Sequence, residues 1–194
     1  MFSKKNKKII YLSSDAVFDG IKGDYRETSK TNPVNKYGFH KKLMENYIKN
    51  KSRNFLIIRI SKVFSSKKND QTFLNEMLYN LKKKINYKYA YDEYFTPISI
   101  NDLISGIYNL IIKDLKGIFH LKSINKISRY QLAKKIVKNL KYKNNIKKIS
   151  FKSLDLFAKR GLNLDLNLNK YDNIFRKNKN NINYYINQII KNYK

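Results

Sequence analysis

Two short apolar runs separated by a helical pattern constrain the fold of this chain more than any other feature. The first run covers residues 9–12 and ends in the polar stretch Ser13-Ser14-Asp15, and the second covers Phe55–Ile60. Between them the pattern is helical over residues 35–50. The order strand, helix, strand predicts a parallel βαβ unit in which the first strand is buried and its carboxyl end opens into a polar loop. Ligand sites of open α/β sheets lie at such strand ends.

The rest of the chain continues to alternate helical and extended patterns. Helices are expected over 70–84, over 102–113 after a cap at Asn101, from Ser128 onward and around 184–190, and extended segments over 85–96, 117–121 and 146–151. In the first helix, Asn35 can act as the cap, and Leu43, Tyr47 and Ile48 are expected on one apolar face. The chain is therefore predicted to be an α/β protein, and we expect one compact unit over residues 1–194.

The net charge of +28 suggests a nucleic-acid or other polyanion partner, because Lys and Arg neutralise phosphates. Only six of the 42 basic residues are Arg, however, and the Lys are spread from Lys4 to Lys194 together with many Asn, Ile, Tyr and Phe. A/T-rich codons account for that whole set. A nucleic-acid module instead concentrates its charge on one face and favours Arg. We therefore expect a solvated basic surface and no nucleic-acid partner, and polyanion binding stays as a third, weaker alternative.

Cysteine is absent, so neither a disulfide framework nor a thiolate metal site can form. The apolar run at residues 9–12 is far too short for a signal sequence or a membrane span. His40 and His120 are far apart, and the carboxylates show no metal-ligand spacing, so no metal site is expected. These features favour a cytoplasmic protein without a membrane segment.

The residues with the clearest chemical meaning are Tyr37 and Lys41, spaced i and i+4 near the start of the first helix. This spacing places both side chains on one helix face, about one turn apart. A Lys ammonium beside a phenol favours the phenolate form, so that a Tyr in this setting can act as a general acid or base. Reduction of a carbonyl by hydride needs such a proton donor. The strand-end hydroxyls of Ser13 and Ser14 could donate a further hydrogen bond to the same oxygen.

The longer motifs around these residues resemble those of extended short-chain dehydrogenase/reductases, in particular the dTDP-4-dehydrorhamnose reductase group. The matching stretches are Ser13-Ser14-Asp15-Ala16-Val17-Phe18-Asp19-Gly20, Asn32-Pro33-Val34-Asn35-Lys36-Tyr37-Gly38-Phe39-His40-Lys41 and Ile58-Arg59-Ile60-Ser61, with Tyr25 and Glu27 between the first two. Shorter similarities at Phe95-Thr96-Pro97 and Gly117-Ile118-Phe119-His120-Leu121 extend the resemblance over nearly the whole chain.

The resemblance implies roles for the central residues. Tyr37 would be the proton donor, Lys41 would tune it and hold the nicotinamide ribose, and Ser14 would be the hydroxyl partner on the sugar carbonyl. Ser13, with Lys41 and Tyr37, would belong to the cofactor side, and the cofactor would be NADP or NAD. The reaction would be reduction of a dTDP-4-keto-6-deoxysugar.

Further implied positions concern the nucleotide-sugar substrate. Asp15 and Asn35 would support its binding at the loop and at the helix start, and Arg160 would contact its phosphates. The implied fold is a partial, C-terminal Rossmann-like parallel sheet with a small substrate-binding lobe. Residues 1–65 would carry the catalytic Ser, Tyr and Lys, and about 85–100 plus 146–180 would form the lobe.

Three departures from the family pattern are visible. The six glycines, at positions 20, 23, 38, 106, 117 and 161, form no G-x-G-x-x-G turn for a dinucleotide, so the chain is expected to be an N-terminally truncated form that does not bind the cofactor alone. Ala16 stands where an aromatic residue is usual, and Lys62 where Trp is usual. A supplied N-terminal half or a homo-oligomer are the expected partners, and a regulatory module like the methionine adenosyltransferase subunit is the alternative to an enzyme.

Overall fold

A three-stranded parallel sheet forms one half of the molecule. The computed structural model describes residues 7–67, 70–83, 88–141, 146–154, 158–175 and 182–192. The strands β1 (Ile9–Ser14), β2 (Phe55–Ile60) and β7 (Gly117–Leu121) lie in the order β1-β2-β7. Their carboxyl ends align, with Ser14 opposite Ile60 and Ile60 opposite Leu121. The predicted βαβ unit and the α/β class with a parallel sheet are thereby confirmed.

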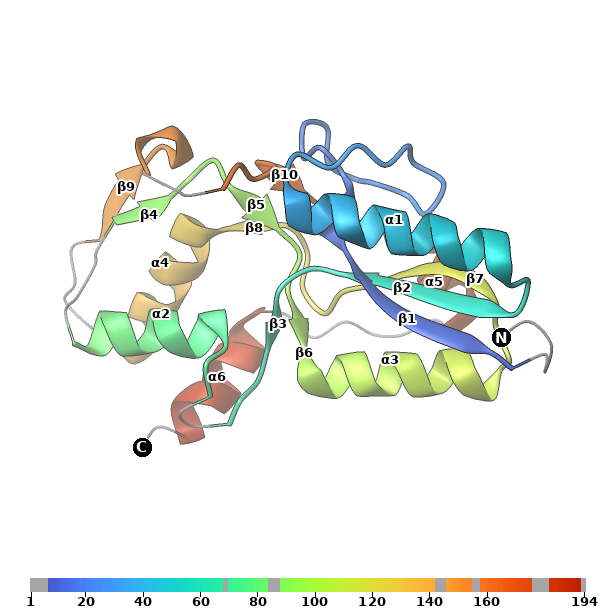
Figure 1. The fold of residues 1–194 in the computed structure, drawn as a ribbon. Helices are drawn as coiled ribbons and strands as arrows, with labels where there is room; N and C mark the ends of the chain where they lie inside the picture. The colour runs from blue at the N-terminus through green and yellow to red at the C-terminus, as the bar shows by residue number, and fades with distance from the viewer. Residues whose placement is uncertain are drawn as a thin grey trace.

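Two helices cover the two faces of this sheet (Figure 1). On one face, α1 (Lys36–Lys51) connects β1 to β2. On the other face, α3 (Ile100–Ile112) packs its Leu103 and Leu110 against Leu56 and Ile58 of β2. The short helix α5 (Asn169–Phe175) lies against β7 and adds Tyr171 to the same core. The sheet therefore has its own apolar core.

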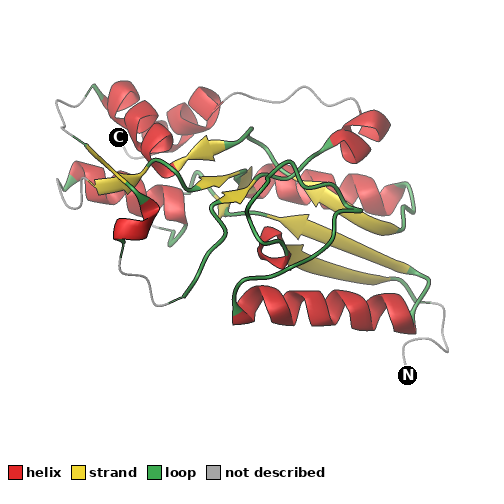
Figure 2. Cartoon of the chain, turned by 90° about the horizontal axis from the view of Figure 1, so that it is seen from above, coloured by secondary structure: helices red, strands yellow, loops and turns green. Residues whose placement is uncertain are grey.

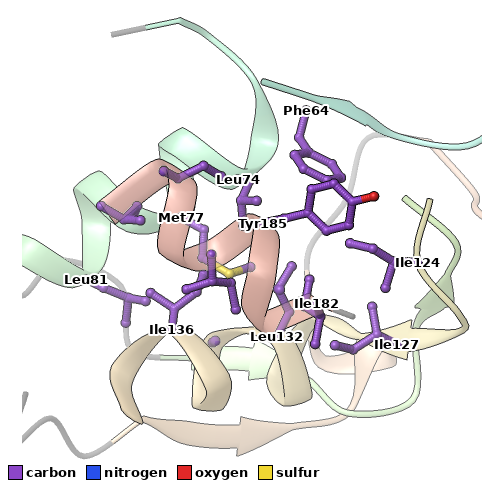
Figure 3. Packing of buried hydrophobic residues seen from close by; sticks show 14 of the residues in the cluster. Phe64, Leu74, Met77, Leu81, Ile124, Ile127, Leu132, Ile136, Ile182 and Tyr185 are labelled. Atoms are coloured by element: carbon purple, nitrogen blue, oxygen red, sulfur yellow. The ribbon is translucent and has the colours of Figure 1, made fainter. Parts of the chain in front are cut away.

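The other half of the molecule is a smaller lobe built from helices and short strand pairs (Figure 2). Its helices are α2 (Phe73–Lys82), α4 (Arg129–Leu140) and α6 (Ile182–Asn192). Leu78, Ile136 and Ile186 are buried in the core where these helices meet, a second cluster separate from that of the sheet (Figure 3). The pair of β4 (Lys88–Ala90) and β9 (Lys147–Ile149) lies beside this core.

The remaining elements are short. They are η2 (Asp15–Val17), β3 (Val63–Phe64), β5 (Tyr94–Phe95), β6 (Ile98–Ser99), β8 (Ile127–Ser128), η3 (Phe151–Ser153) and β10 (Asn163–Leu164). β3 pairs with β6, and β10, β5 and β8 form a small sheet in that order. Within the described part of the chain, no helix is long and apolar enough to cross a membrane.

The ranges expected for the small lobe, 85–100 and 146–180, supply β4, β5, β6, β9 and β10, and residues 85–87, 155–157 and 176–180 of them lie outside the described residues. Most of the lobe core comes from other segments, because α2, α4 and α6 all lie outside those ranges. α5 falls inside the second range but packs on the parallel sheet. The lobe is thus composed mainly of helices that the expected ranges leave out.

Helix starts follow the predictions at two of three positions. Asn35 caps α1 by accepting from the amide of Gly38 at 2.9 Å, and Ser128 opens α4 with a capping box completed by Gln131. The predicted cap at Asn101 is wrong, because Ser99 caps α3 and accepts from the amide of Asp102 at 3.1 Å. The backbone amide of Ser99 donates to the Ser123 hydroxyl at 2.8 Å. This contact holds Ser99 at the start of α3, two residues before the expected cap.

The predicted apolar face of α1 is largely wrong. Leu43 and Tyr47 are 49% and 59% exposed, and only Ile48 of the three expected residues is buried. The helix instead buries Gly38 and Glu45 against the sheet. Glu45 thus lies on the buried side of the helix, where an apolar residue would be expected. Its carboxylate can be buried there because it has a buried cationic partner.

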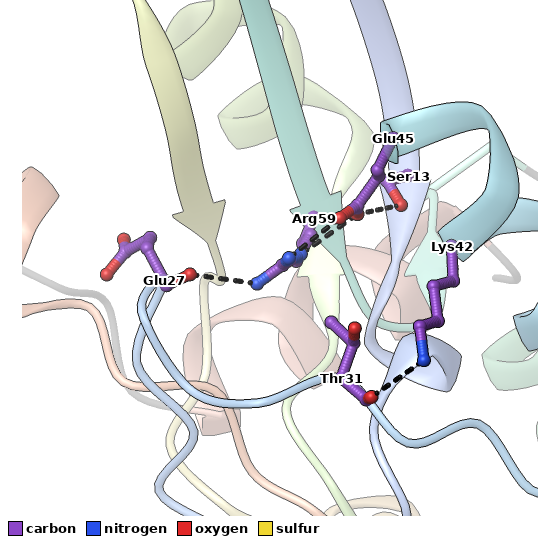
Figure 4. Close-up of polar contacts among 6 residues, drawn as sticks. All are labelled: Ser13, Glu27, Thr31, Lys42, Glu45 and Arg59. Carbon is purple, nitrogen blue, oxygen red and sulfur yellow. Dashed lines mark hydrogen bonds and ion pairs between the residues drawn. The ribbon is translucent and has the colours of Figure 1, made fainter. Parts of the chain in front are cut away.

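That partner is Arg59 on β2 (Figure 4). The guanidinium donates through Nε to Glu45 Oε1 at 2.9 Å and through Nη2 to Oε2 at 2.7 Å, and both side chains are at most 2% exposed. Ser13 of β1 donates to Oε1 at 2.5 Å, and Arg59 Nη1 donates to the carbonyl of Glu27 at 3.2 Å. A single buried network therefore joins β1, α1, β2 and the loop before the helix.

Gly38 allows α1 to approach the turn after β1. A Cβ atom at this position would lie 2.0 Å from the carbonyl oxygen of Ala16, which is fixed backbone. Helical Gly106 makes a different contact, because its Cβ would meet the Cδ1 end of the Leu121 side chain at 2.8 Å. A glycine at the third position of α1 is therefore a packing requirement.

We predict that Glu45→Gln lowers the free energy of unfolding by about 3–5 kcal/mol, because it leaves the Arg59 charge buried without its counter-ion. Urea unfolding followed by circular dichroism measures this loss. The matched control, Glu76→Gln, changes an exposed carboxylate on α2 and should stay within about 1 kcal/mol of the wild type. Equal losses in the two variants would contradict the prediction.

We also predict opposite outcomes for two helical glycines. Gly38→Ala should destabilise the protein by about 1–3 kcal/mol, because the methyl group overlaps a backbone carbonyl. Gly106→Ala should cost less than about 1 kcal/mol, since the higher helix propensity of Ala offsets a small movement of the Leu121 side chain. The same unfolding measurement compares them, and a Gly38→Ala protein at least as stable as Gly106→Ala would refute the packing argument.

Candidate functional site

A cavity of about 310 Å³ lies at the carboxyl ends of β1 and β2, where the sheet meets the smaller lobe. Ser14 and Asp15 line it from the end of β1, Lys62 from the segment after β2, and Tyr37 from the first turn of α1. The lobe side of the wall consists of Glu93, Tyr94, Phe95, Arg160, Gly161 and Leu164. The cavity thus occupies the position where ligands bind in open α/β sheets.

Tyr37 and Lys41 lie together at the start of α1, as their spacing predicts. The Lys41 ammonium is 5.7 Å from the centre of the Tyr37 ring and 4.9 Å from that of Tyr11. Its Nζ donates to the carbonyl of Leu12 at 2.9 Å. Lys41 is therefore held between Tyr37 and strand β1, while the Tyr37 ring is 57% exposed and borders the cavity.

Ser14 ends β1 with its side chain on the cavity. Its Oγ accepts from the amide of Ala16 at 3.2 Å and lies 3.0 Å from Asp15 Oδ1, to which it donates. Ser14 and Tyr37 line the same cavity, so a substrate oxygen between them could receive hydrogen bonds from both hydroxyls.

Asp15 is buried beside Ser14. Burial raises the pKa of its carboxyl above the usual value, against the opposing effects of the Ser14 hydroxyl and the Lys62 charge. A carboxyl group with a raised pKa more readily keeps its proton.

Ser13 points in the opposite direction from Ser14, because successive side chains of a strand alternate between its two faces. Its hydroxyl donates to Glu45 Oε1 under α1, in the buried network described above. The structure therefore places Ser13 behind the strand and separates it from the cavity that Ser14 lines.

Asn35 and Arg160 both line the cavity, although 125 positions apart in the chain. Asn35 Nδ2 donates to the carbonyl of Lys159 at 2.9 Å, while its Oδ1 caps α1. Close packing of Gly20 against Gly161 brings the same C-terminal segment to the loop after β1, since a Cβ on Gly20 would lie 2.3 Å from the Gly161 Cα. These contacts fix Arg160 opposite the end of β1.

Sequence reasoning missed several residues of this site. From the sequence, Lys62 is noted only as a departure from a family pattern, and Ser61, Glu93 and Tyr94 receive no role, yet all four line the cavity. For Ser61 and Lys62 a signal existed, because they directly follow a buried strand as Ser13 and Ser14 do. Glu93 and Tyr94 lie at the start of the short lobe strand β5, whose place at the cavity is decided by tertiary packing.

Among the described residues, no three His, Cys, Asp or Glu side chains are grouped so that they could hold a metal ion.

Comparisons with known proteins agree with this architecture. A dTDP-4-dehydrorhamnose reductase of Sinorhizobium fredii is 31% identical over 134 residues, which cover 65% of this chain and 45% of the relative. Methionine adenosyltransferase 2 subunit beta of Xenopus tropicalis is 26% identical over 133 residues, covering 64% of this chain and 39% of that protein. The crystal structure of dTDP-4-dehydrorhamnose reductase from Bacillus anthracis in complex with NADP has a TM-score of 0.83 at 23% identity, covering 98% of this chain and 66% of that one.

The chain thus spans about half the length or less of these two curated relatives. The likeness to the Bacillus anthracis structure supports the Rossmann-like fold of the described residues. The family model of the RmlD substrate binding domain matches residues 2–194, nearly the entire chain. Because this match covers nearly the whole chain, the chain belongs to the RmlD substrate binding domain family.

Proposed function

We propose that this chain provides the proton-donating and substrate-binding part of an NAD(P)H-dependent reductase that acts on a 4-keto-6-deoxysugar nucleotide. The observation that carries the proposal is that Tyr37 and Ser14 line one cavity while Lys41 lies directly behind Tyr37. Carbonyl reduction requires a proton donor and a second hydrogen-bond donor at the oxygen that gains charge. The dTDP-4-dehydrorhamnose reductase from Sinorhizobium fredii supports this choice of substrate class.

In this mechanism Tyr37 donates its phenolic proton to the substrate oxygen. Ser14 donates a hydrogen bond to the same oxygen, which requires its hydroxyl to turn from Asp15 toward the cavity. The Lys41 ammonium stabilises the phenolate that remains, because it stays within 6 Å of the ring. Asp15 and Asn35 keep the loop and the helix start in place around the sugar.

NADPH or NADH would supply the hydride for this reaction. The residues of this chain fit the nicotinamide end of such a cofactor, because Lys41 and Tyr37 border the exposed side of β1. The turn that binds a pyrophosphate is not among the six glycine positions. We therefore assign the contact with the nicotinamide ribose to Lys41. The contact with the cofactor phosphates is assigned to a further polypeptide.

Strand β1 supports the existence of such a further polypeptide, either an N-terminal half or a second copy. β1 lies at the edge of the described sheet, and its Ile10 and Leu12 are 43% and 41% exposed. An apolar edge strand is a ready surface for pairing. The cytoplasmic location expected from the absence of cysteine remains a prediction.

The second candidate function is a non-catalytic binding module. The 26% identity with methionine adenosyltransferase 2 subunit beta of Xenopus tropicalis favours it. The two functions differ in one respect that can be tested, because a binding module needs the cavity and the fold but not the phenolic hydroxyl of Tyr37. Polyanion binding is supported only by the net charge of +28.

We predict that Tyr37→Phe lowers turnover by about 10²–10⁴-fold, the usual contribution of general acid catalysis. The assay is NADPH-dependent reduction of a dTDP-4-keto-6-deoxysugar by the chain fused behind the dinucleotide-binding half of a dTDP-4-dehydrorhamnose reductase. Tyr47→Phe, an exposed residue on the same helix, is the matched control and should leave turnover unchanged. Equal rates for Tyr37→Phe and the unmodified fusion would exclude the proposed mechanism, and an inactive but folded fusion would favour the binding module.

A further inference from the structure

A groove of about 640 Å³ lies on the smaller lobe, between α4, the first residue of α6 and the segment that leads into β8. None of its lining residues belongs to the cavity at Ser14 and Tyr37. Its floor is apolar, because the side chains of Ile124, Ile127 and Ile182 lie side by side there (Figure 3). The volume of this α4 groove falls within the range of about 300–1,000 Å³ that is usual for ligand pockets.

Four lysines surround the apolar floor of the α4 groove. Lys134, Lys135 and Lys138 are exposed on α4, and Lys126 is exposed in the segment before β8. Residues three and four positions apart share one side of a helix, so the three ammonium groups of α4 lie on the same side. Like charges at this spacing repel each other, and the arrangement is therefore unfavourable for the helix alone.

The described residues supply no counter-charge to these lysines. No Asp or Glu lines the α4 groove, and none of the four lysines forms an ion pair with a described residue. The carboxylate of Asp102 lies next to the groove residue Ser123, but it already accepts hydrogen bonds from the hydroxyls of Ser123 and Tyr185. The α4 groove therefore presents positive charge around an apolar floor. A ligand that is acidic and partly apolar is complementary to it.

The chemistry of the α4 groove favours an acidic peptide over a nucleic acid. Nucleic-acid sites favour Arg for the phosphates and aromatic side chains for stacking on the bases. The lining residues of the groove include neither an Arg nor an aromatic residue. An apolar side chain between acidic residues of a peptide would cover the isoleucines of the floor and gain free energy from that burial. A phosphate backbone offers no such side chain.

We propose that the α4 groove is a docking site for an acidic segment of a partner protein. One apolar side chain of the segment contacts the isoleucine floor, and the carboxylates on either side of it contact the lysines. The proposal does not depend on the reductase activity. The two places are nevertheless adjacent, because the Lys126 ammonium is 5.2 Å from the centre of the Tyr94 ring, and Tyr94 lines the first cavity.

Fluorescence anisotropy with the full chain, at about 0.15 M salt, tests the site with a labelled peptide of Asp and Glu residues around a single Leu. Lys134→Gln combined with Lys138→Gln should weaken binding about 10-fold, because each of the two exposed charge pairs contributes about a factor of three. The matched control, Lys49→Gln combined with Lys51→Gln, removes the same charge from the exposed end of α1. This control should bind within about twofold of the unmodified chain, since distant exposed charges are screened.

A second peptide, in which Ser replaces the Leu, tests the apolar floor without altering the protein. It should bind the unmodified chain about 10-fold more weakly than the Leu peptide, because the apolar burial is lost. Losses confined to the α4 variant and to the Ser peptide support the docking site.

Three results would overturn the proposal. Equal losses in the two double variants would show that only the general positive charge binds the peptide. Absence of binding to the unmodified chain, or equal binding of the Leu and Ser peptides, would remove the specific site. A labelled oligothymidylate serves as the nucleic-acid probe, and tighter binding of this probe that the α4 substitutions weaken would assign the groove to nucleic acid instead.

Discussion

The buried ion pair of Glu45 and Arg59 is the interaction on which the arrangement of the site depends. Glu45 is placed eight residues after Tyr37, and Lys41 lies midway between them. Residues spaced by four share one side of a helix. Fixing Glu45 on Arg59 and Ser13 therefore turns Lys41 and Tyr37 toward β1 as well, and the hydrogen bond from Lys41 to the Leu12 carbonyl follows from that rotation. A buried pair of this kind adds little net stability over a well-packed apolar pair, but it has one permitted geometry. Here that geometry sets the direction of the candidate proton donor.

The fold could be predicted from sequence where local patterns and burial agree. The runs that became β1, β2 and β7 are short and apolar, and the caps at Asn35 and Ser128 have the side chains that such positions require. The apolar face of α1 could not be found in this way. Periodicity counts Leu43 and Tyr47 as core residues, whereas the core position belongs to Glu45, whose burial depends on an Arg fourteen residues later on another strand. No local pattern carries that information.

The same division holds in the candidate site. Ser14, Tyr37, Lys41 and Asn35 lie within one βαβ unit, so spacing along the chain already indicates that they are close. Arg160 and Glu93 reach the cavity only through the packing of the lobe on the sheet, which uses the contact of Gly20 with Gly161 and the small β10-β5-β8 sheet. Lys62 stands between these groups. It follows a predictable strand, yet the charged residues Glu93 and Arg160 around it come from the lobe, and so its place in the site becomes visible only in the folded chain.

The side chains of Ser13 and Ser14 point to opposite faces of β1, so the two residues make different contacts. Ser13 faces α1 and helps to hold the helix, while Ser14 faces the cavity. Tyr37 lies at the boundary, with Lys41 and the edge of β1 on one side and the cavity on the other. A proton donor at this boundary can reach a substrate oxygen in the cavity while a cofactor lies along the exposed side of β1. Because Gly38 keeps the helix start against the turn of Asp15–Val17, the distance between the two sides is set by backbone contacts rather than by flexible side chains. The wall of the candidate site that carries Tyr37, Lys41 and Ser14 is therefore fixed by backbone packing.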